Sequence, residues 1–126
     1  RYVDATLETI SAAANVELPD DMRATITNSD DPNAYPMSLF TWILVYKDQE
    51  YNNRTAEDAS QLVDLLRYII SPNGQKVAAQ INYAPLPLQA LEKNSQLIGK
   101  INYGGAAVPP GSISAVADSV GTVLNE

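Results

Sequence analysis

The feature that most constrains this chain is an apolar run at residues 39–46, Leu-Phe-Thr-Trp-Ile-Leu-Val-Tyr. Aromatic and β-branched residues of this kind favour strands. The run lacks the alternation of apolar and polar residues that marks a strand with one face in water. A strand that is apolar on both faces is typical of a sheet covered by helices on both sides. We therefore predict an interior strand at residues 39–46.

A helix is predicted after this strand. Thr55 is a suitable N-cap, and Asp58 takes the third helical position, where a capping box usually has Glu or Gln. The helix should end before Ser71, because the proline that follows disfavours helical backbone in the residue before it. Its inward side consists of apolar residues spaced three and four apart, namely Ala59, Leu62, Val63, Leu66, Ile69 and Ile70.

The same spacing predicts three shorter helices, at residues 4–14, 75–81 and 88–101. Either Asp4 or Thr6 caps the first of them. A short run at residues 24–27, Ala-Thr-Ile-Thr, is β-prone. A buried strand among helices indicates an α/β fold in which the sheet is flanked by helices.

Turn and linker residues divide the chain. Residues 28–33, Asn-Ser-Asp-Asp-Pro-Asn, are a dense cluster of turn formers, which places a boundary at residues 29–35. Residues 104–111, Gly-Gly-Ala-Ala-Val-Pro-Pro-Gly, are linker-like. Beyond them Ser112 caps a candidate amphipathic helix, whose apolar side comprises Ile113, Val116, Ala117, Val120, Val123 and Leu124. We therefore interpret residues 104–126 as a linker-like tail with a candidate short helix.

The chain has 126 residues, a formal net charge of −7, and neither cysteine nor histidine. These absences exclude disulfides, thiolate nucleophiles, Ser-His-Asp catalysis and metal sites built from cysteine or histidine. The acidic balance disfavours DNA and RNA as partners. No apolar run approaches the roughly 18 residues of a membrane-spanning helix. The chain opens on Arg1-Tyr2-Val3 without an initiator Met, which favours a processed start or a piece of a longer protein.

Acidic residues are the first candidates for a metal or catalytic site. Asp20-Asp21 and Asp30-Asp31 can supply oxygen ligands to Ca²⁺ or Mg²⁺. The sequence lacks the ligand spacing and the downstream Glu of a calcium loop, so solvated turns are the favoured interpretation. The segments that look buried contain no Asp or Glu, which disfavours a carboxylate pair for acid–base catalysis. We therefore expect no enzyme activity, no metal and no cofactor.

Ser38 and Thr41 are the candidate ligand-binding residues. Their hydroxyls can donate to an anion at a sheet edge, whereas the alternative is that Ser38 begins the strand and Thr41 packs through its methyl group. Residues 71–74, Ser-Pro-Asn-Gly, precede a helix and resemble an anion site in outline. They lack the glycine run and the Lys of a phosphate-binding loop, so a turn between helices is favoured.

Several stretches of the sequence resemble one known family. Residues 34–38 (Ala-Tyr-Pro-Met-Ser) lead into residues 40–49 (Phe-Thr-Trp-Ile-Leu-Val-Tyr-Lys-Asp-Gln), and residues 73–78 (Asn-Gly-Gln-Lys-Val-Ala) and 81–87 (Ile-Asn-Tyr-Ala-Pro-Leu-Pro) follow. Their order and spacing are similar to those of the phosphate-binding receptors of bacterial phosphate ABC transporters, the PstS family of periplasmic-binding-protein-like receptors. The opening residues are also similar to that family, so the resemblance covers about residues 1–101.

The resemblance implies a two-lobed α/β binding protein of which this chain is the C-terminal part. Residues 1–32 would end the second lobe, and residues 29–35 would cross the hinge. Residues 33–103 would form the C-terminal part of the first lobe, with residues 39–46 inside its sheet. Residues 104–126 depart from the family.

The resemblance also implies a function for the whole receptor. It would bind inorganic phosphate outside the cytoplasm, in the periplasm or as a cell-surface lipoprotein, and deliver it to the permease of an ABC transporter. The family's phosphate-binding motifs lie upstream and have no counterpart here, and neither Arg23 nor Arg54 stands in such a motif, so no phosphate ligand is assigned. The N-terminal remainder of the receptor is then an expected partner. Two alternatives stay open: a stand-alone interaction or assembly domain without a ligand site, and a receptor for another oxyanion or an enzyme-attached relative.

Overall fold

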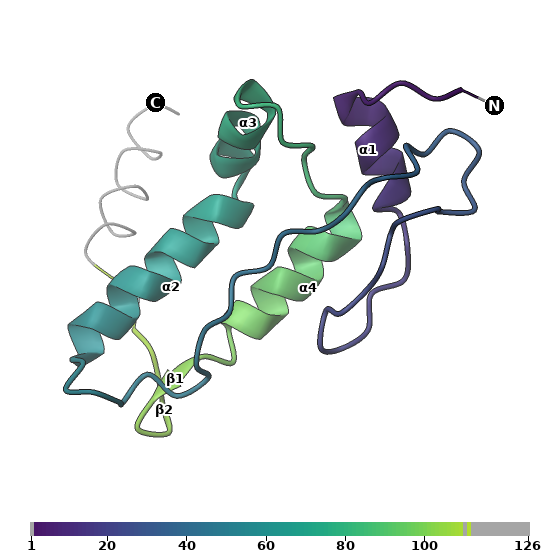
Figure 1. Cartoon of the computed structure of the whole chain (residues 1–126). Helices are drawn as coiled ribbons and strands as arrows, with labels where there is room; N and C mark the ends of the chain where they lie inside the picture. The colour runs from purple at the N-terminus through teal and green to yellow at the C-terminus, as the bar shows by residue number, and fades with distance from the viewer. Residues whose placement is uncertain (1, 110, 112–126) are drawn as a thin grey trace. The chain divides into compact units, whose positions relative to one another are not determined.

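A computed structural model describes residues 2–109 and 111 (Figure 1). Helices dominate it, and the described strands form a two-stranded antiparallel sheet, which gives a small mixed α and β fold. The elements are α1 (Leu7–Ala13), α2 (Ala56–Ile70), α3 (Pro72–Gln80), α4 (Leu88–Ile98), β1 (Asn102–Tyr103) and β2 (Ala106–Ala107). No helix among the described residues has both the length and the apolar character needed to span a membrane.

The described residues divide into two compact units. Unit 1 comprises residues 2–44 and 72–93, and unit 2 comprises residues 45–71, 94–109 and 111. The cuts do not coincide with the predicted boundary at residues 29–35. Each unit has its own small apolar core, and the candidate site residues Ser38 and Thr41 belong to unit 1.

Unit 1 is built around α1. Thr6 is its N-cap: the Thr9 N–H donates to Thr6 Oγ1 at 3.2 Å, and the Thr6 N–H donates to Thr9 Oγ1 at 3.0 Å, a capping box in which Thr replaces Glu. The residues of the core around α1 are small apart from Ile26, so α1 lies close to the loops that cover it. This core consists of Ala13, Ala14, Ile26 and Ala34, with Ala12, Val16 and Phe40 packed against it.

Unit 2 is built around α2, and its start confirms the prediction. The Asp58 N–H donates to Thr55 Oγ1 at 3.1 Å, and the Thr55 N–H donates to Asp58 Oδ2 at 2.8 Å. These two bonds satisfy main-chain donors that the first helical turn leaves unpaired. The core beneath α2 consists of Val63, Leu66, Ile98 and Ile101, with Leu62, Ile70 and Val108 packed against it.

The strands β1 and β2 form a hairpin whose turn and second strand, residues 104–107, fall in the stretch predicted to be linker-like. Gly104 and Gly105 form its two-residue turn at φ 57° and 80°, the left-handed backbone that a type I′ hairpin requires. Asn102 also pairs in parallel with Asp48: its N–H donates to the Lys47 carbonyl, and its carbonyl accepts from the Gln49 N–H, both at 2.8 Å. Residues 102–107 are therefore ordered by pairing, unlike a linker.

The bounds of the three shorter helices differ from the predicted ones. α1 spans Leu7–Ala13 rather than residues 4–14, because Thr6 is its N-cap. α3 begins at Pro72 rather than at residue 75, because proline suits the first helical position, where no N–H is needed. α4 ends at Ile98, three residues before the predicted end, and a turn at residues 99–100 leads into β1. The predicted helix after Ser112 lies outside the described residues.

The prediction of a buried strand at residues 39–46 is wrong for this structure. The segment forms no strand, and most of its side chains are exposed, with Leu44 at 93%. Its main-chain N–H groups make no hydrogen bond to another described residue. The physical reason is the absence, among the described residues, of neighbouring strands to pair with it. An apolar pattern favours a strand but does not supply its partners.

Candidate functional site

A cavity of about 510 Å³ lies within unit 1. Its walls come mainly from α1, α3, residues 35–41 and the segment 82–86. Both Ser38 and Thr41 line it, so the structure brings the two predicted site residues to one place. The lining contains no Lys, Arg, Asp or Glu. The lining does include neutral hydrogen-bond donors, among them Thr41, Gln75 and Asn82, so any anion in this cavity would be held without an opposite charge.

Ser38 is buried, at 3% exposure, and its hydroxyl closes a turn. Its Oγ donates to the Tyr35 carbonyl at 2.8 Å, and its own carbonyl accepts from Thr27 Oγ1 at 3.1 Å. Thr41 is exposed. Because the Ser38 hydroxyl proton is donated to the Tyr35 carbonyl, it is not available to a ligand in this arrangement. Ser38 instead holds residues 35–38 in place beside the cavity.

The cavity wall opposite residues 35–41 depends on Gln75. Pro85 and Pro87 have no main-chain N–H, which leaves Leu86 as the donor between them. Its N–H donates to Gln75 Oε1 at 2.7 Å. From the other side, Ser11 Oγ of α1 donates to the Pro85 carbonyl at 3.1 Å. These bonds fix the proline-rich elbow between α1 and α3, and sequence reasoning missed them.

Asn82 ends α3 with a Schellman motif. Its φ is 64°, in the left-handed region, where Asn is tolerated better than most residues. The Tyr83 N–H donates to the Ala78 carbonyl at 2.9 Å, and the Asn82 N–H donates to the Ala79 carbonyl at 3.1 Å. The chain therefore reverses at Asn82, and this turn carries the elbow back to the cavity.

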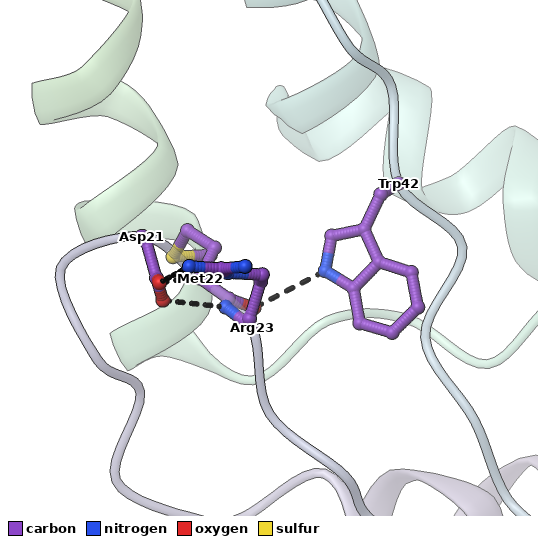
Figure 2. Close-up of polar contacts among 4 residues, drawn as sticks. All are labelled: Asp21, Met22, Arg23 and Trp42. Carbon is purple, nitrogen blue, oxygen red and sulfur yellow. Dashed lines mark hydrogen bonds and ion pairs between the residues drawn. The ribbon is translucent and has the colours of Figure 1, made fainter.

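One side of the segment 36–42 faces an earlier part of unit 1. The Trp42 indole N–H donates to the Met22 carbonyl at 3.1 Å (Figure 2). Thr27 reaches the Ser38 carbonyl through its hydroxyl, and the Asn28 N–H donates to the Pro36 carbonyl at 2.8 Å. These contacts run antiparallel and rely largely on side chains, so the β-prone residues 24–27 lie beside the segment without forming a strand with it.

The turn at Met22 is held by the residues on either side (Figure 2). The Asp21 carboxylate accepts from the Arg23 main-chain N–H at 3.0 Å and from Arg23 Nε at 2.8 Å. These bonds lower the pKa of the Asp21 carboxyl below its usual value. The bond from the Arg23 main-chain N–H has the larger effect, and the bond from the Arg23 side chain comes next. Arg23 is thus engaged in a surface turn, and it does not line the cavity.

The other acidic residues singled out from the sequence, Asp20, Asp30 and Asp31, lie in or next to turns and bends. Asp20 pairs with Lys93 at 3.1 Å, and Asp31 Oδ1 accepts from the Asn33 N–H at 2.8 Å. Within residues 2–109 and 111, no group of three or more Asp and Glu residues is placed to hold a metal ion.

Comparison of the chain with models of protein families, with curated proteins and with solved structures found no match.

Proposed function

We propose that this chain is the C-terminal part of an extracytoplasmic phosphate-binding receptor for an ABC transporter. The proposal rests on the resemblance of residues 34–49 and 73–87 to that family. The structural observation that supports it is the state of residues 39–46, which are apolar, mostly exposed, and without main-chain pairing to the other described residues. Such a segment is what remains of an interior strand when its neighbours are missing.

The cavity supports the same proposal. It is lined mainly by apolar residues, and Leu39 and Phe40 at the start of the apolar segment form part of its wall. Apolar side chains on neighbouring strands of the receptor would fill such a space and remove its surface from water. The N-terminal remainder of the receptor would supply those strands. We propose that the two together form the sheet of one lobe of a two-lobed α/β protein.

Phosphate recognition would come from the completed receptor. The chain supplies no arginine at the cavity, so the donors that hold the anion would lie in the remaining polypeptide. A chain with a net charge of −7 can belong to such a receptor, because local main-chain dipoles rather than net charge provide the favourable field. The receptor would act without catalysis outside the cytoplasm and transfer phosphate to a membrane permease.

The second candidate function is a stand-alone interaction or assembly domain. The uncharged cavity and the exposed apolar segment favour this candidate, since both suit the docking of another polypeptide better than the binding of an anion. The two candidates differ in what phosphate does, and calorimetric titration separates them.

Phosphate is titrated into the chain alone and into the chain together with the receptor's remaining polypeptide. The receptor proposal predicts no heat of binding for the chain alone and saturable binding for the complete protein. Sulfate titrated into the complete protein is the control for another oxyanion and is expected to compete poorly. Phosphate binding by the chain alone, or no phosphate binding by the complete protein, would contradict the proposal.

A further inference from the structure

Two segments of unit 1 face each other in the register of an antiparallel pair. The Asn28 N–H donates to the Pro36 carbonyl at 2.8 Å, and the Trp42 indole N–H donates to the Met22 carbonyl at 3.1 Å. In an antiparallel pair, each step forward along one segment is matched by a step back along the other. Residue 28 opposite residue 36 therefore predicts residue 22 opposite residue 42. The two bonds, made at the two ends of the contact, agree on one register.

Between these two ends the main chain is left without partners. The register places Ile26 opposite Ser38, and Ala24 opposite Phe40. The main-chain groups of Ala24, Ile26 and Phe40 make no hydrogen bond to another described residue. Ile26 and Ser38 are each only 3% exposed. A main-chain group that is buried without a partner is rare in native proteins, because it loses its bonds to water and gains none in return.

A side chain takes one of the places that a main-chain donor would fill. The Ser38 carbonyl, which the register offers to the Ile26 N–H, accepts from Thr27 Oγ1 at 3.1 Å. The Ser38 N–H donates to the Tyr35 carbonyl at 3.3 Å, which is longer than most bonds of this kind. Both bonds can be exchanged for main-chain bonds between Ile26 and Ser38 without a change of register.

We propose that residues 22–28 and 36–42 close into a β-hairpin strap, with residues 29–35 as its loop. Each of the two facing pairs named above then exchanges two main-chain hydrogen bonds, and the bonds at the two ends of the register remain. The β-prone residues 24–27 and the turn formers that follow them suit the arm and the loop of such a hairpin.

The two ends of the strap are fixed by groups that cannot extend the pairing. Pro36 has no main-chain N–H, so it accepts from Asn28 and returns no bond. The Met22 N–H already donates to the Pro19 carbonyl at 2.9 Å, so the Trp42 indole remains the link at the other end. The closed strap is therefore limited to the two pairs between these ends.

Closing the strap changes the surface that a partner meets. The start of the apolar run then has one strand neighbour within its own chain, and the main-chain groups of Leu39 and Thr41 stay on the opposite, open edge. Another polypeptide can add a strand to that open edge alone. The proposal does not depend on the phosphate-binding function.

Amide hydrogen exchange of the full chain, followed by NMR, tests the proposal. In the closed strap the N–H groups of Ala24, Ile26 and Phe40 are bonded, whereas those of Thr25 and Leu39 point away from the facing arm. We expect the first three amides to exchange at least about tenfold more slowly than the last two. Equal exchange in the two groups would overturn the proposal. Slow exchange of Leu39 alone would also overturn it, because that pattern indicates pairing with a second copy on the open edge.

A disulfide across the arms gives an independent measurement, because the chain has no cysteine of its own. Thr25 and Leu39, both exposed, face each other in the closed strap at a position where Cα atoms lie about 4.5 Å apart, within the range of a disulfide. Thr25→Cys with Leu39→Cys should therefore form an intramolecular disulfide about tenfold faster than the control, Thr25→Cys with Thr41→Cys, which is out of register. The oxidised pair should keep the Ile26 and Phe40 amides slow. Equal rates of oxidation, or faster exchange of these amides after oxidation, would overturn the proposal.

Discussion

The Trp42 indole donates a 3.1 Å hydrogen bond to the carbonyl of Met22, whose φ of 62° places it in the left-handed region. This backbone is unusual for a residue other than glycine or Asn, and it turns the Met22 carbonyl toward the indole (Figure 2). Trp42 also meets the edge of Phe40, with ring centroids 6.1 Å apart. The bond joins two segments of unit 1 that are also held together by the polar contacts of Thr27 and Asn28 and by the packing of Phe40 against the core that contains Ile26.

Trp42→Phe tests that bond. Phenylalanine keeps an aromatic ring beside Phe40 but has no N–H for the Met22 carbonyl. We expect the free energy of unfolding to fall by about 1 kcal/mol, the usual net contribution of one hydrogen bond. Urea denaturation followed by circular dichroism measures it, because the substitution removes the single tryptophan. Tyr2→Phe at an exposed site is the control and should leave the stability unchanged. A stability equal to that of the control would show that the bond contributes nothing.

Leu44→Lys tests whether residues 39–46 are exposed in the chain alone. The Leu44 side chain lies almost entirely in water, so the charge should change the free energy of unfolding by less than about 0.5 kcal/mol. The same charge should reduce self-association, because it blocks pairing at an open strand edge. Sedimentation velocity and urea denaturation measure the two effects. Val63→Lys, at a buried position of α2, is expected to unfold unit 2. Comparable destabilisation by Leu44→Lys would contradict the exposed segment.

Gln75→Ala removes the acceptor of the Leu86 N–H. The two flanking prolines allow little rearrangement of the elbow, so this half-buried donor would lose its partner. We expect a loss of about 1–3 kcal/mol in the free energy of unfolding. Gln80→Ala removes an exposed glutamine from the same helix and serves as the matched control. Thermal and urea denaturation give both values, and equal stability of the two variants would refute the role of Gln75.

Gly105→Ala tests the type I′ turn between β1 and β2. Gly105 has φ 80° and no heavy atom within 4 Å of where a Cβ would lie, so the cost comes from the backbone alone. The left-handed conformation of an L-residue costs roughly 1–2 kcal/mol, and unit 2 should lose about that much stability. Gly105→Asn should lose less, since Asn tolerates this conformation. If alanine and asparagine had equal effects, the turn would differ from the one described.

Asp48 links the stability of unit 2 to pH. The Glu50 N–H, and then the Gly104 N–H, donate to its carboxylate and lower the pKa of Asp48 from the ordinary 3.8. The pKa of Asp48 is lower in the folded protein than in the unfolded chain. The Asp48 carboxylate therefore stabilises the fold fully at a pH above its unfolded pKa, and this stabilisation is lost as the pH falls through its folded pKa. Asp48→Asn should therefore flatten the decline of stability below about pH 4. Urea denaturation across the acid range measures it, and an unchanged decline would contradict the prediction.

The helix α2 shows what local sequence can establish. Thr55 and Asp58 are three residues apart, and the capping box that they form needs no other part of the chain. The apolar spacing from Ala59 to Ile70 likewise fixes which side of the helix faces a core. The end at Ile70 follows from Pro72 in the same way. Such features are predictable because all the atoms involved lie within one or two turns.

The candidate site was predictable only in part. Ser38 and Thr41 could be selected because hydroxyl residues stand at the start of the apolar run, and both line the cavity. Their surroundings could not be predicted, since the bond from Leu86 to Gln75 and the bond from Trp42 to Met22 join residues far apart in the sequence. The sequence feature that comes closest to predicting the bond from Leu86 to Gln75 is the pair Pro85 and Pro87. These prolines have no main-chain N–H, so the Leu86 N–H is the donor between them.

Residues 39–46 show where local sequence preference stops predicting the structure and tertiary contacts decide it. Their sequence establishes that the segment is apolar and favours a strand, yet the segment forms none. Whether an apolar segment becomes a strand depends on main-chain partners, which are distant in the sequence or belong to other polypeptide. Propensity is a property of each residue, whereas pairing, burial and cavities are properties of the assembled fold. For that reason the local pattern determined the helices and their caps, and only the tertiary structure decided that the Trp42 segment lies exposed.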